Sequence, residues 1–425
     1  MQDTILRILT VSNTVLCALF FICYFYQIVF ILVAYLKKSK VFPDAPPHKF
    51  AILIAARNEE NVIGKLISTL SEQNYPKDCY DIFVTADNCT DNTAEAARSL
   101  GATVYERHNN ELIGKGYVLD FMIKNIWRER GDDAYDAFIV FDADNEVEAD
   151  FLAEINKTFA AGYDVISTYR NTTNYGYGWR TAGVGLYYLR DARILNDARM
   201  KIGSNTFLTG TGFLFSNKLA RENSGWPYHT LTEDFEFTMQ NAIDGVKTAY
   251  CGTARFFDWQ SKDFRQSWRQ RLRWTKGGFQ VMVKYRKQLL RGFFSRRAFS
   301  CLDMTICIFA AFLVSMLAIA VNLVGYVAYF SCGGDPLIVI AQLGLMIAGA
   351  YSAILLFSIP LTVSEWRRLR ASSFKKILYC LTFPAYLFSF IPVAFVALFK
   401  KEVEWKPIYH GDTAKRDGEH TGQED

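Results

Sequence analysis

The sequence has few histidines and no cysteine motif of the kinds that bind metals. Its five histidines are scattered, and none of its nine cysteines belongs to a CxxC pair or another metal-ligand spacing. A zinc site is therefore not expected, and we interpret the cysteines as free thiols of a reducing compartment. The formal net charge is only +4, so the charge balance gives no indication of nucleic acid as a partner. Internal repeats are absent as well.

Apolar residues are plentiful instead. They make up 51% of the chain, with 34 Phe and 23 Tyr, a composition typical of a soluble domain joined to a few membrane helices. Residues from about 11 to 36 are nearly all apolar, which is long enough to cross a bilayer. This segment lacks the basic start and the cleavage site of a signal peptide, so we predict an N-terminal transmembrane helix within residues 1–40. The lysines that follow it, Lys37, Lys38 and Lys40, predict that the next domain is cytoplasmic.

The last third of the chain carries further apolar stretches, at about 301–330, 337–363 and 377–399. We assign residues 299–400 to C-terminal transmembrane or re-entrant helices. Pro384 and Pro392 each remove a backbone donor, so the third stretch is expected to be a broken, interfacial or re-entrant element. The polar tail, residues 401–425, would then be cytoplasmic and able to close over the active site as a lid.

The middle of the chain, residues 48–260, alternates between two patterns. Short β-type runs (FAILIAA, YDIFVTA, AFIVFDA) alternate with helical patterns at 60–73, 91–100 and 114–128. This alternation predicts an α/β domain with a Rossmann-like, mostly parallel sheet. Ligands of such sheets bind at the carboxyl ends of the strands. Polar clusters follow the runs at those ends: Arg57-Asn58-Glu59-Glu60, Asp87-Asn88 and Asp142-Ala143-Asp144.

The pair Asp142 and Asp144 ends an apolar run. Alternate residues of a strand point the same way, so both carboxylates can face one ligand. Hard oxygen ligands suit Mg²⁺ or Mn²⁺, which usually share their coordination shell with substrate phosphates. The alternative is a solvated pair of aspartates in a loop, and the position at the end of a strand favours the metal site.

Two other residues at strand and helix ends indicate a nucleotide. Asp87 ends the second run, where its carboxylate can accept a hydrogen bond from a nucleobase or a ribose. Lys115, between two glycines, lacks the spacing of a P-loop. It can lie beside a pyrophosphate or simply begin a helix, and the sequence leaves both interpretations open.

A carboxylate for proton transfer is found in Thr232-Glu233-Asp234. Transfer of a group to a hydroxyl needs a base that takes the proton of the acceptor. Asp234 opens a helical pattern, and we expect the helix N-terminus to keep it ionised, as a base requires. The alternative is a plain helix cap.

Residues 261–298 are rich in Arg, Lys, Trp and Phe at helical spacing, which predicts interfacial amphipathic helices. Within them, Gln270, Arg273 and Trp274 share one helix face. They offer an amide, a guanidinium for phosphate and a flat ring for a sugar. Arg271 lies off this face, and we expect it at lipid headgroups.

These motifs, in this order, resemble the inverting family 2 glycosyltransferases of GT-A fold, which include cellulose, chitin, hyaluronan and poly-N-acetylglucosamine synthases. The resemblance covers about residues 48–290. It implies a UDP-sugar donor, Asp87 at the uracil, Asp142 near the ribose and diphosphate, and Asp144 on the metal. It implies Asp234 as general base, with Glu233 beside it. The nucleotide site would also contain Ala55, Arg57, Glu59, Lys115, Gln270, Arg273 and Trp274, and the acceptor site Thr209, Gly210, Thr211, Gly212 and Trp274.

The sequence therefore predicts a multi-pass hexosyltransferase of the cell membrane that extends a β-linked polysaccharide from UDP-N-acetylglucosamine or UDP-glucose. The chain has fewer predicted spans than cellulose or hyaluronan synthases, so transfer of single sugars to a lipid acceptor is the first alternative. A nucleotide-sensing transporter or receptor is the second, and the scarcity of charge in the spans, Asp303 excepted, argues against it. The partners expected are a nucleotide sugar, a carbohydrate or lipid-linked acceptor and the bilayer. The sequence leaves open whether the chain forms a homo-oligomer.

Overall fold

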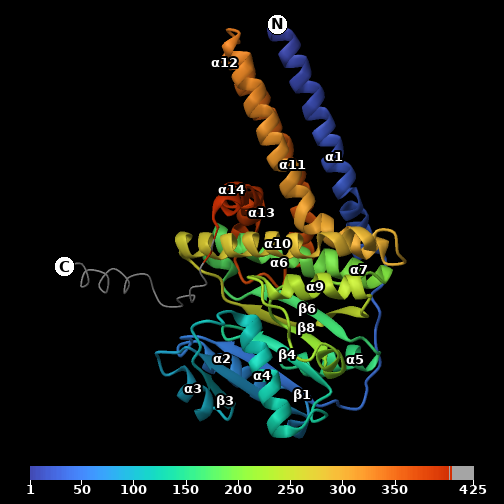
Figure 1. The fold of residues 1–425 in the computed structure, drawn as a ribbon, viewed down its shortest axis with the longest axis vertical. Helices are drawn as coiled ribbons and strands as arrows, with labels where there is room; N and C mark the ends of the chain where they lie inside the picture. Colours follow the sequence, from blue (N-terminus) through green and yellow to red (C-terminus); the bar gives the residue numbers. More distant parts are fainter. Residues whose placement is uncertain (402, 404–425) are drawn as a thin grey trace, which may run out of the picture.

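A computed structural model describes residues 1–401 and 403. The chain divides into a layered α/β part at one end and a group of long apolar helices at the other (Figure 1). The tail that we predicted to close as a lid, with Trp405 and His410, lies outside the described residues.

The α/β part is built on one eight-stranded sheet of order β3-β2-β1-β4-β7-β6-β8-β5. Pairing is parallel between β1 and β2, β1 and β4, β2 and β3, and β6 and β8, whereas β7 and β5 pair antiparallel to their neighbours. The predicted α/β fold with a mostly parallel sheet is confirmed. The strands are β1 (Phe50–Ala56), β2 (Tyr80–Asp87), β3 (Thr103–Arg107), β4 (Ala137–Asp142), β5 (Glu146–Val147), β6 (Val165–Thr172), β7 (Phe213–Ser216) and β8 (Thr248–Asp258).

Strand β1 shows why the sheet is buried on both faces. Successive side chains of a strand point to opposite faces, and β1 is apolar throughout. Phe50, Ile52 and Ile54 belong to the larger hydrophobic core on one side. Ala51 and Leu53 belong to a second core on the other side. A parallel strand between two helix layers needs this unbroken apolar run.

Helices cover both faces of the sheet. The helices α2, α3 and α4 lie close to the predicted helical patterns, and Figure 1 shows them on the part of the sheet farthest from the long helices. A seven-residue π-helical segment, Arg190–Asn196, joins α6 to α7. The helices of this part are α2 (Ile63–Ser71), α3 (Thr93–Ser99), α4 (Lys115–Arg130), α5 (Phe151–Ala160), α6 (Trp179–Leu189), α7 (Asp197–Ile202), α8 (Asn217–Glu222) and α9 (Glu233–Asp244).

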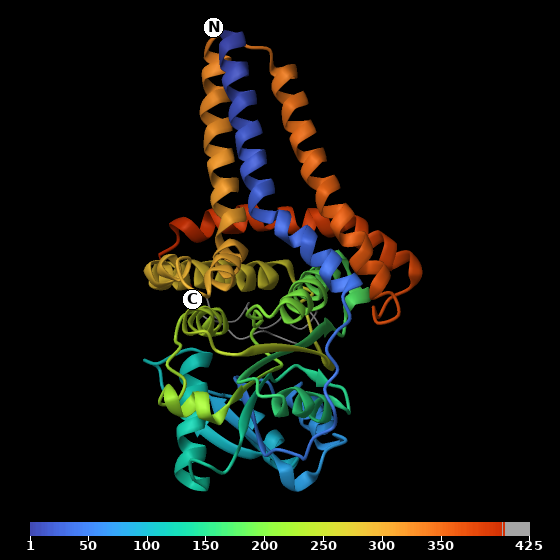
Figure 2. The ribbon, with the colours of Figure 1, turned by 90° about the vertical axis from the view of Figure 1, so that its right-hand side faces the viewer.

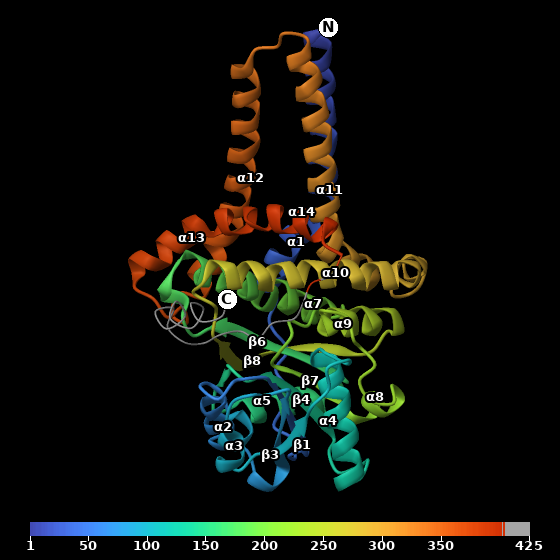
Figure 3. The ribbon, with the colours of Figure 1, turned by 60° about the vertical axis from the view of Figure 1, so that its left-hand side comes forward.

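Helix α10 (Phe264–Gly292) lies between the sheet and the apolar helices. The helices α1 (Gln2–Leu36), α11 (Ala298–Ser331) and α12 (Pro336–Ser364) project from this layer in one direction (Figures 1 and 3). By length and composition, four described segments could cross a membrane. They are α1, the part of α11 from Phe312 onwards, α12, and the pair formed by α13 and α14 over Ser373–Phe399. Such helices associate the chain with a membrane.

The last apolar stretch is bent. Figures 2 and 3 show α13 (Ser373–Phe388) and α14 (Phe390–Phe399) lying across the bases of the projecting helices, close to α10. The break falls at Ser389, whereas Pro384 lies inside α13. Pro392 lies in the first turn of α14, where no intrahelical N–H bond is lost. The prolines therefore do not mark the break, contrary to our expectation for Pro384.

Arg271 ties α10 to this bend. Its side chain is 2% exposed, its Nη1 donates to the Ser389 hydroxyl, and its guanidinium lies over the rings of Tyr386 and Phe390 at 5.4 and 5.2 Å. The expectation that Arg271 meets lipid headgroups is wrong. The helix periodicity correctly placed this residue off the face of Gln270, but α13 and α14 cover the face that it occupies.

The projecting helices are fixed to the α/β part by buried polar contacts. Arg199 of α7 forms two bonds to Asp303 of α11, with Nε–Oδ2 at 2.7 Å and Nη2–Oδ1 at 3.0 Å, and each residue is 1% exposed. The Tyr26 hydroxyl of α1 donates to the same carboxylate at 2.9 Å. Farther along, the amides of Asn13 and Asn322 bond to each other in both directions, at 3.0 and 2.7 Å.

We predict that Arg199→Met destabilises the protein strongly, because Asp303 would stay buried without its cation. Breaking one side of a buried ion pair typically costs about 3–5 kcal/mol, which thermal unfolding in detergent can measure. The control is Arg98→Met, which breaks an exposed ion pair with Glu106 and is expected to cost less than about 1 kcal/mol. Equal melting temperatures for the two variants would contradict the prediction.

Candidate active site

One large cavity, of about 1530 Å³, runs from the carboxyl ends of the sheet strands to the space between the projecting helices. Its walls come from the sheet edge, α9, α10 and the long helices. Most residues predicted from the sequence line it, although they are far apart in the chain. They are Ala55, Arg57, Glu59, Asp87, Lys115, Asp142, Asp144, Thr209, Gly210, Glu233, Asp234, Gln270, Arg273 and Trp274.

The two aspartates at the end of β4 lie on opposite sides of a tight turn. Lys115, the first residue of α4, makes an ion pair with Asp142 and donates to the Gly210 carbonyl at 2.8 Å. Asn145 Nδ2 donates to Asp144 Oδ1 at 3.2 Å. Lys115 therefore begins a helix and also lies at a carboxylate of the cavity, and its place beside a pyrophosphate stays a prediction.

The segment after α7 was predicted to line the acceptor site with four residues, and this is correct in placement for only two. Thr209 and Gly210 line the cavity. Thr211 is 2% exposed and its hydroxyl accepts from the Asp142 backbone N–H at 2.8 Å. Gly212, at φ +63°, is packed so closely that a Cβ there would come within 2.0 Å of the Phe256 ring. Thr211 and Gly212 therefore support the aspartate turn from behind and do not face the cavity.

Asp87 has a partner that the sequence did not reveal. Arg107, at the end of β3, pairs with Asp87 Oδ1 at 2.5 Å, and both side chains are almost fully buried. Arg107 also donates to the Leu112 carbonyl at 2.7 Å. One carboxylate oxygen is thus held by the protein, which fixes the direction in which the other can point. The signal that could have revealed this ion pair is the position of the two residues. Asp87 and Arg107 each end a strand, and the ends of two neighbouring parallel strands lie side by side.

Glu233 and Asp234 begin α9, and each is 6% exposed. Burial, and to a lesser extent the neighbouring Glu233, raise the pKa of Asp234 to about 7, although the backbone N–H of Phe235, Lys115 and Arg273 lower it. Burial also raises the pKa of Glu233. Our expectation that the helix N-terminus keeps Asp234 ionised is therefore met only in part, because a pKa of about 7 leaves a share of the carboxyl groups protonated at neutral pH. The helix terminus acts in the expected direction, but exclusion of water outweighs it.

Helix α10 brings its predicted face to the cavity. Arg273 Nη1 donates to the Leu231 carbonyl at 3.1 Å, just before the acidic start of α9. The ring of Trp274 meets Tyr188 edge to face, with centroids 6.0 Å apart. The side chains of Gln270, Arg273 and Trp274 all line the cavity.

The carboxylates fit a divalent cation that shares its ligands with a substrate. Within the described part of the chain, no group of three His, Cys, Asp or Glu side chains could hold a metal. Mg²⁺ is usually bound by only one or two carboxylates together with substrate phosphates. Asp144 and Asp142 would supply those carboxylates, and Lys115 already neutralises part of the charge of Asp142.

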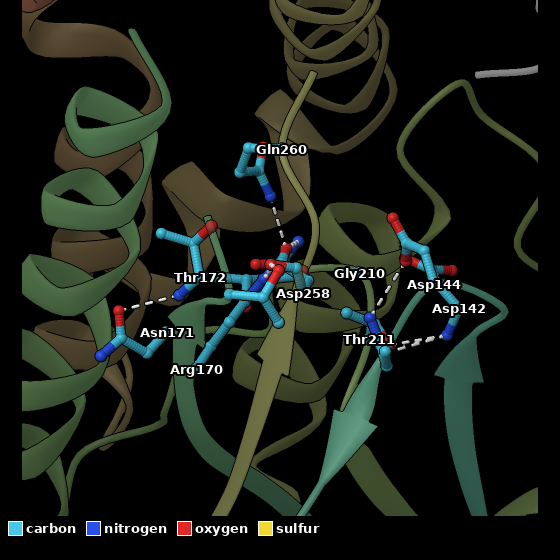
Figure 4. A network of polar contacts seen from close by, with 12 residues as sticks. Asp142, Asp144, Arg170, Asn171, Thr172, Gly210, Thr211, Asp258 and Gln260 are labelled. Carbon is cyan, nitrogen blue, oxygen red and sulfur yellow. Dashed lines mark hydrogen bonds and ion pairs between the residues drawn. The ribbon is translucent and has the colours of Figure 1, made fainter. Parts of the chain in front are cut away.

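Three further residues line the cavity but carry no recognisable motif. Asp258 ends β8, Arg170 lies on β6, and Gln260 follows β8 (Figure 4). Arg170 and Gln260 both donate to Asp258 Oδ2, through Nε at 2.9 Å and Nε2 at 2.7 Å. These residues could not be predicted from the sequence. The charged side chains of buried strands form ion pairs only after the sheet has formed.

Comparison with known proteins identifies the family. The family model described as "Glycosyltransferase like family 2" matches residues 46–277, more than half of the chain, and the chain belongs to this family. The predicted glycosyltransferase is confirmed at the level of the family. The mannosyltransferase PcManGT from Pyrobaculum calidifontis, solved in complex with GDP-Man and Mn²⁺, aligns over 95% of this chain and 100% of its own at 17% identity, with a TM-score of 0.64. This likeness confirms the GT-A fold.

Curated relatives match the chain in part. The Beta-monoglucosyldiacylglycerol synthase of Synechocystis sp. is 26% identical over 56% of this chain and 50% of its own, and that of Nostoc sp. is 26% identical over 57% and 51%. The probable glycosyltransferase YdaM of Bacillus subtilis is 23% identical over 57% and 58%. The chain thus spans about half the length of the curated relatives it matches. The names of these relatives do not refer to cellulose, chitin or hyaluronan, so the narrower resemblance is not supported by them.

We expect the rate of sugar transfer to fall on the acid side of about pH 7, where Asp234 becomes protonated. A raised carboxyl pKa means that the basic form is lost as the pH drops, so kcat/KM should decline about tenfold per pH unit there. Asp234→Asn should reduce transfer by about 10²–10⁴-fold above pH 7 and should remove the decline of the rate towards acid pH. The dissociation constant of the nucleotide diphosphate, measured over the same range, serves as the control. A flat pH profile in the wild type would remove Asp234 from the role of base.

We predict that Asp144→Ala abolishes the metal dependence of nucleotide binding, because of the two aspartates proposed for the cation only Asp142 would remain, and it is paired with Lys115. Calorimetry with and without Mn²⁺ measures this. Chelation with EDTA should stop the wild-type reaction, and Mg²⁺ or Mn²⁺ should restore it. Glu106→Ala, which removes an exposed carboxylate outside the cavity, is the matched control. Undiminished turnover in EDTA would show that the aspartates serve another purpose.

Proposed function

We propose that the chain is a membrane-bound, inverting hexosyltransferase that moves a sugar from a nucleotide diphosphate to the hydroxyl of a lipid acceptor. The donor would bind at the carboxyl ends of β1, β2 and β4. The acceptor would reach the same site from the side of the projecting helices.

The observation that carries this proposal is the continuity of the cavity. At one end it is lined by carboxylates and Lys115, and at the other by apolar side chains of three helices. A sugar nucleotide is polar and charged, whereas an acyl chain is apolar, so one cavity with these two ends suits both substrates of a glycolipid synthase. The apolar end includes Leu16 and Phe20 of α1, Phe312 and Met316 of α11, and Ile347 and Ala350 of α12.

The relatives agree with a lipid acceptor. Two of them are named for the synthesis of monoglucosyldiacylglycerol, a lipid that carries one sugar. Their similarity to this chain is limited to the shared half, so the acceptor remains part of the proposal. We propose further that the α/β part is cytoplasmic, because Lys37, Lys38 and Lys40 follow α1, and Arg367 and Arg368 follow α12.

The proposed reaction is a single displacement. The acceptor oxygen forms a bond to the anomeric carbon while the bond from that carbon to the phosphate oxygen breaks, and Asp234 takes the acceptor proton. Lys115 and Arg273 lie next to the acidic pair and would stabilise the charge that develops on the departing diphosphate. A divalent cation on Asp144, when bound, would supply further positive charge there.

The donor is proposed to be a UDP-sugar, UDP-glucose or UDP-N-acetylglucosamine, as the motif resemblance implies. The structural neighbour was solved with GDP-Man and Mn²⁺, which supports a nucleotide sugar and a metal in this fold. A donor panel should therefore contain both UDP- and GDP-sugars.

Extension of a polysaccharide is the second candidate. The side chains of Trp259 and Trp274 both line the cavity, and flat rings next to a sugar site can bind the successive units of a polymer. The two functions differ in product length.

The decisive experiment incubates the purified protein in vesicles that contain diacylglycerol with the donor panel and Mn²⁺. We expect a product whose mass exceeds that of the lipid by one or a few hexoses. A ladder of long, lipid-free chains would instead establish polymer synthesis. Hydrolysis of the donor with no glycosylated product at all would contradict both functions.

A pair of variants on α12 tests the route of the lipid. Gly349 lines the cavity, and a Cβ there would meet nothing within 4 Å, so Gly349→Trp should fill the apolar end. We expect the apparent KM for diacylglycerol to rise about tenfold or more. The indole ring would take the place of about two or more methylene groups of the lipid, whose burial in the cavity would be lost. The affinity for the nucleotide should not change.

Gly344 provides the matched control. It lies one and a half turns away on the same helix, a Cβ there also meets nothing within 4 Å, and it does not line the cavity. Gly344→Trp should leave the KM for lipid at its wild-type value. Equal effects of the two tryptophans would mean that the lipid does not pass this wall.

A further inference from the structure

The cluster of Arg170, Asp258 and Gln260 has more hydrogen-bond acceptors than the protein supplies with donors. Asp258 is 2% exposed and Gln260 is 3% exposed. Among the described residues, every donor to the Asp258 carboxylate bonds to one oxygen, Oδ2, which accepts from Arg170 and Gln260. The other oxygen, Oδ1, has no partner among the described residues, and neither has Gln260 Oε1.

The orientation of Gln260 follows from elementary chemistry. An ionised carboxylate only accepts hydrogen bonds, so the amide must turn its NH₂ group towards Asp258. Its oxygen is then directed elsewhere. Two acceptor atoms, on adjacent side chains of one cavity wall, are therefore left to be satisfied by something that donates.

Such atoms are costly to leave alone. A buried polar atom without a partner costs about 1–3 kcal/mol, and native proteins contain few of them. In this case both side chains line the cavity, so the two atoms, which are buried from solvent, lie in the wall that a ligand would meet. The guanidinium of Arg170 offsets the charge of Asp258 through a close ion pair. A wall with acceptors but little net charge suits neutral hydroxyl groups and does not suit phosphate.

The surroundings of the cluster indicate what carries those hydroxyls. Arg170 Nη1 also donates to the Thr209 carbonyl, next to the carbonyl of Gly210 that Lys115 holds. The Arg170 guanidinium lies 3.5 Å from the ring centroid of Tyr188, which in turn meets Trp274. Figure 4 shows Asp258 between Gln260 and Arg170, with Asp142 and Asp144 to one side at the end of β4. The cluster therefore lies between the aspartate turn and an aromatic wall.

We propose that Asp258 and Gln260 form a subsite that accepts hydrogen bonds from the hydroxyls of a hexose ring, with Arg170 as the residue that positions Asp258. This proposal rests on the proposed function for the presence of a sugar, and it adds which side chains recognise that sugar. The hexose can belong to the donor or to a glycosylated acceptor, and the shared chemistry is a ring with hydroxyl donors.

Two variants change the acceptors with little change of shape. In Asp258→Asn, Arg170 keeps an oxygen in front of it, so the new NH₂ group replaces Oδ1 in the cavity and an acceptor becomes a donor. Gln260→Met removes the amide oxygen and leaves the Arg170–Asp258 ion pair in place, so it stays informative if Asp258→Asn folds poorly. The control is Glu365→Gln, which turns a carboxylate of 0% exposure, paired with Arg193 and outside the cavity, into an amide.

The first arm measures binding alone. Calorimetry gives the dissociation constants of UDP and UDP-glucose, and of GDP and GDP-mannose, with Mn²⁺ present. In the wild type the hexose should tighten binding by about tenfold or more. If the hexose belongs to the donor, Asp258→Asn and Gln260→Met should lose this advantage while the affinity for UDP or GDP is unchanged. Glu365→Gln should behave as wild type.

The second arm identifies the hydroxyl and its source. Monodeoxy UDP-glucoses and monodeoxy octyl glucosides are compared as donors and acceptors. For the recognised hydroxyl, its removal should cost the wild type about tenfold in kcat/KM and cost Asp258→Asn almost nothing. Loss of discrimination in the donor series assigns the subsite to the transferred sugar, and in the octyl glucoside series to the acceptor.

The subsite is overturned if the variants discriminate against every deoxy sugar as the wild type does and lose no hexose affinity, because water alone would then satisfy the two atoms. A fall in the affinity for UDP and UDP-glucose by the same factor would likewise overturn it in favour of a structural role. The binding arm needs no lipid. A wild type that binds the hexose through these residues but never glycosylates diacylglycerol would therefore refute the proposed acceptor and keep the subsite.

Discussion

Parallel pairing of β1 with β2 and β4 is the constraint on which the site depends. It brings the carboxyl ends of three strands to one edge. Asp87 ends β2 and Asp142 ends β4 at this edge, on either side of β1. The other parts of the site come from elements that pack against that edge. Lys115 comes from the start of α4 and is bonded to the Gly210 carbonyl, Asp234 comes from the start of α9, and Trp274 comes from α10 and contacts the ring of Tyr188. A change of register in this sheet would separate them all.

Much of this arrangement could be predicted from the sequence, and the errors share one physical cause. Apolar runs that end in carboxylates predict strands with a polar edge, and the spacing of Gln270, Arg273 and Trp274 predicts one helix face. That cause is burial by elements that are distant in the sequence, which no local sequence pattern indicates. It raised the pKa of Asp234, covered Arg271 with α13 and α14, and turned Thr211 away from the cavity. The pair of Arg170 and Asp258 spans 88 residues, so no local motif could indicate it.

The cavity also combines a polar, charged lining at one end with an apolar lining at the other. Helix α10 separates the sheet from the projecting helices, yet its inner face is open to both ends of the cavity. Arg273 faces the acidic start of α9, whereas Phe279 of the same helix packs on Phe312 of α11, with ring centroids 4.5 Å apart. A sugar can therefore be held by hydrogen bonds in a place that is only a few turns of helix away from acyl-chain contacts.

The amide pair of Asn13 and Asn322 has a consequence for synthesis on the ribosome. The two residues are 309 positions apart, and a chain grows by roughly 5–20 residues per second, so α1 waits on the order of 15–60 seconds before α11 exists. During that interval the Asn13 side chain lacks its native partner in an apolar helix, and the whole sheet can fold beneath it. Helix α1 is thus joined to α11 late, and the α/β part can reach its shape before this contact exists.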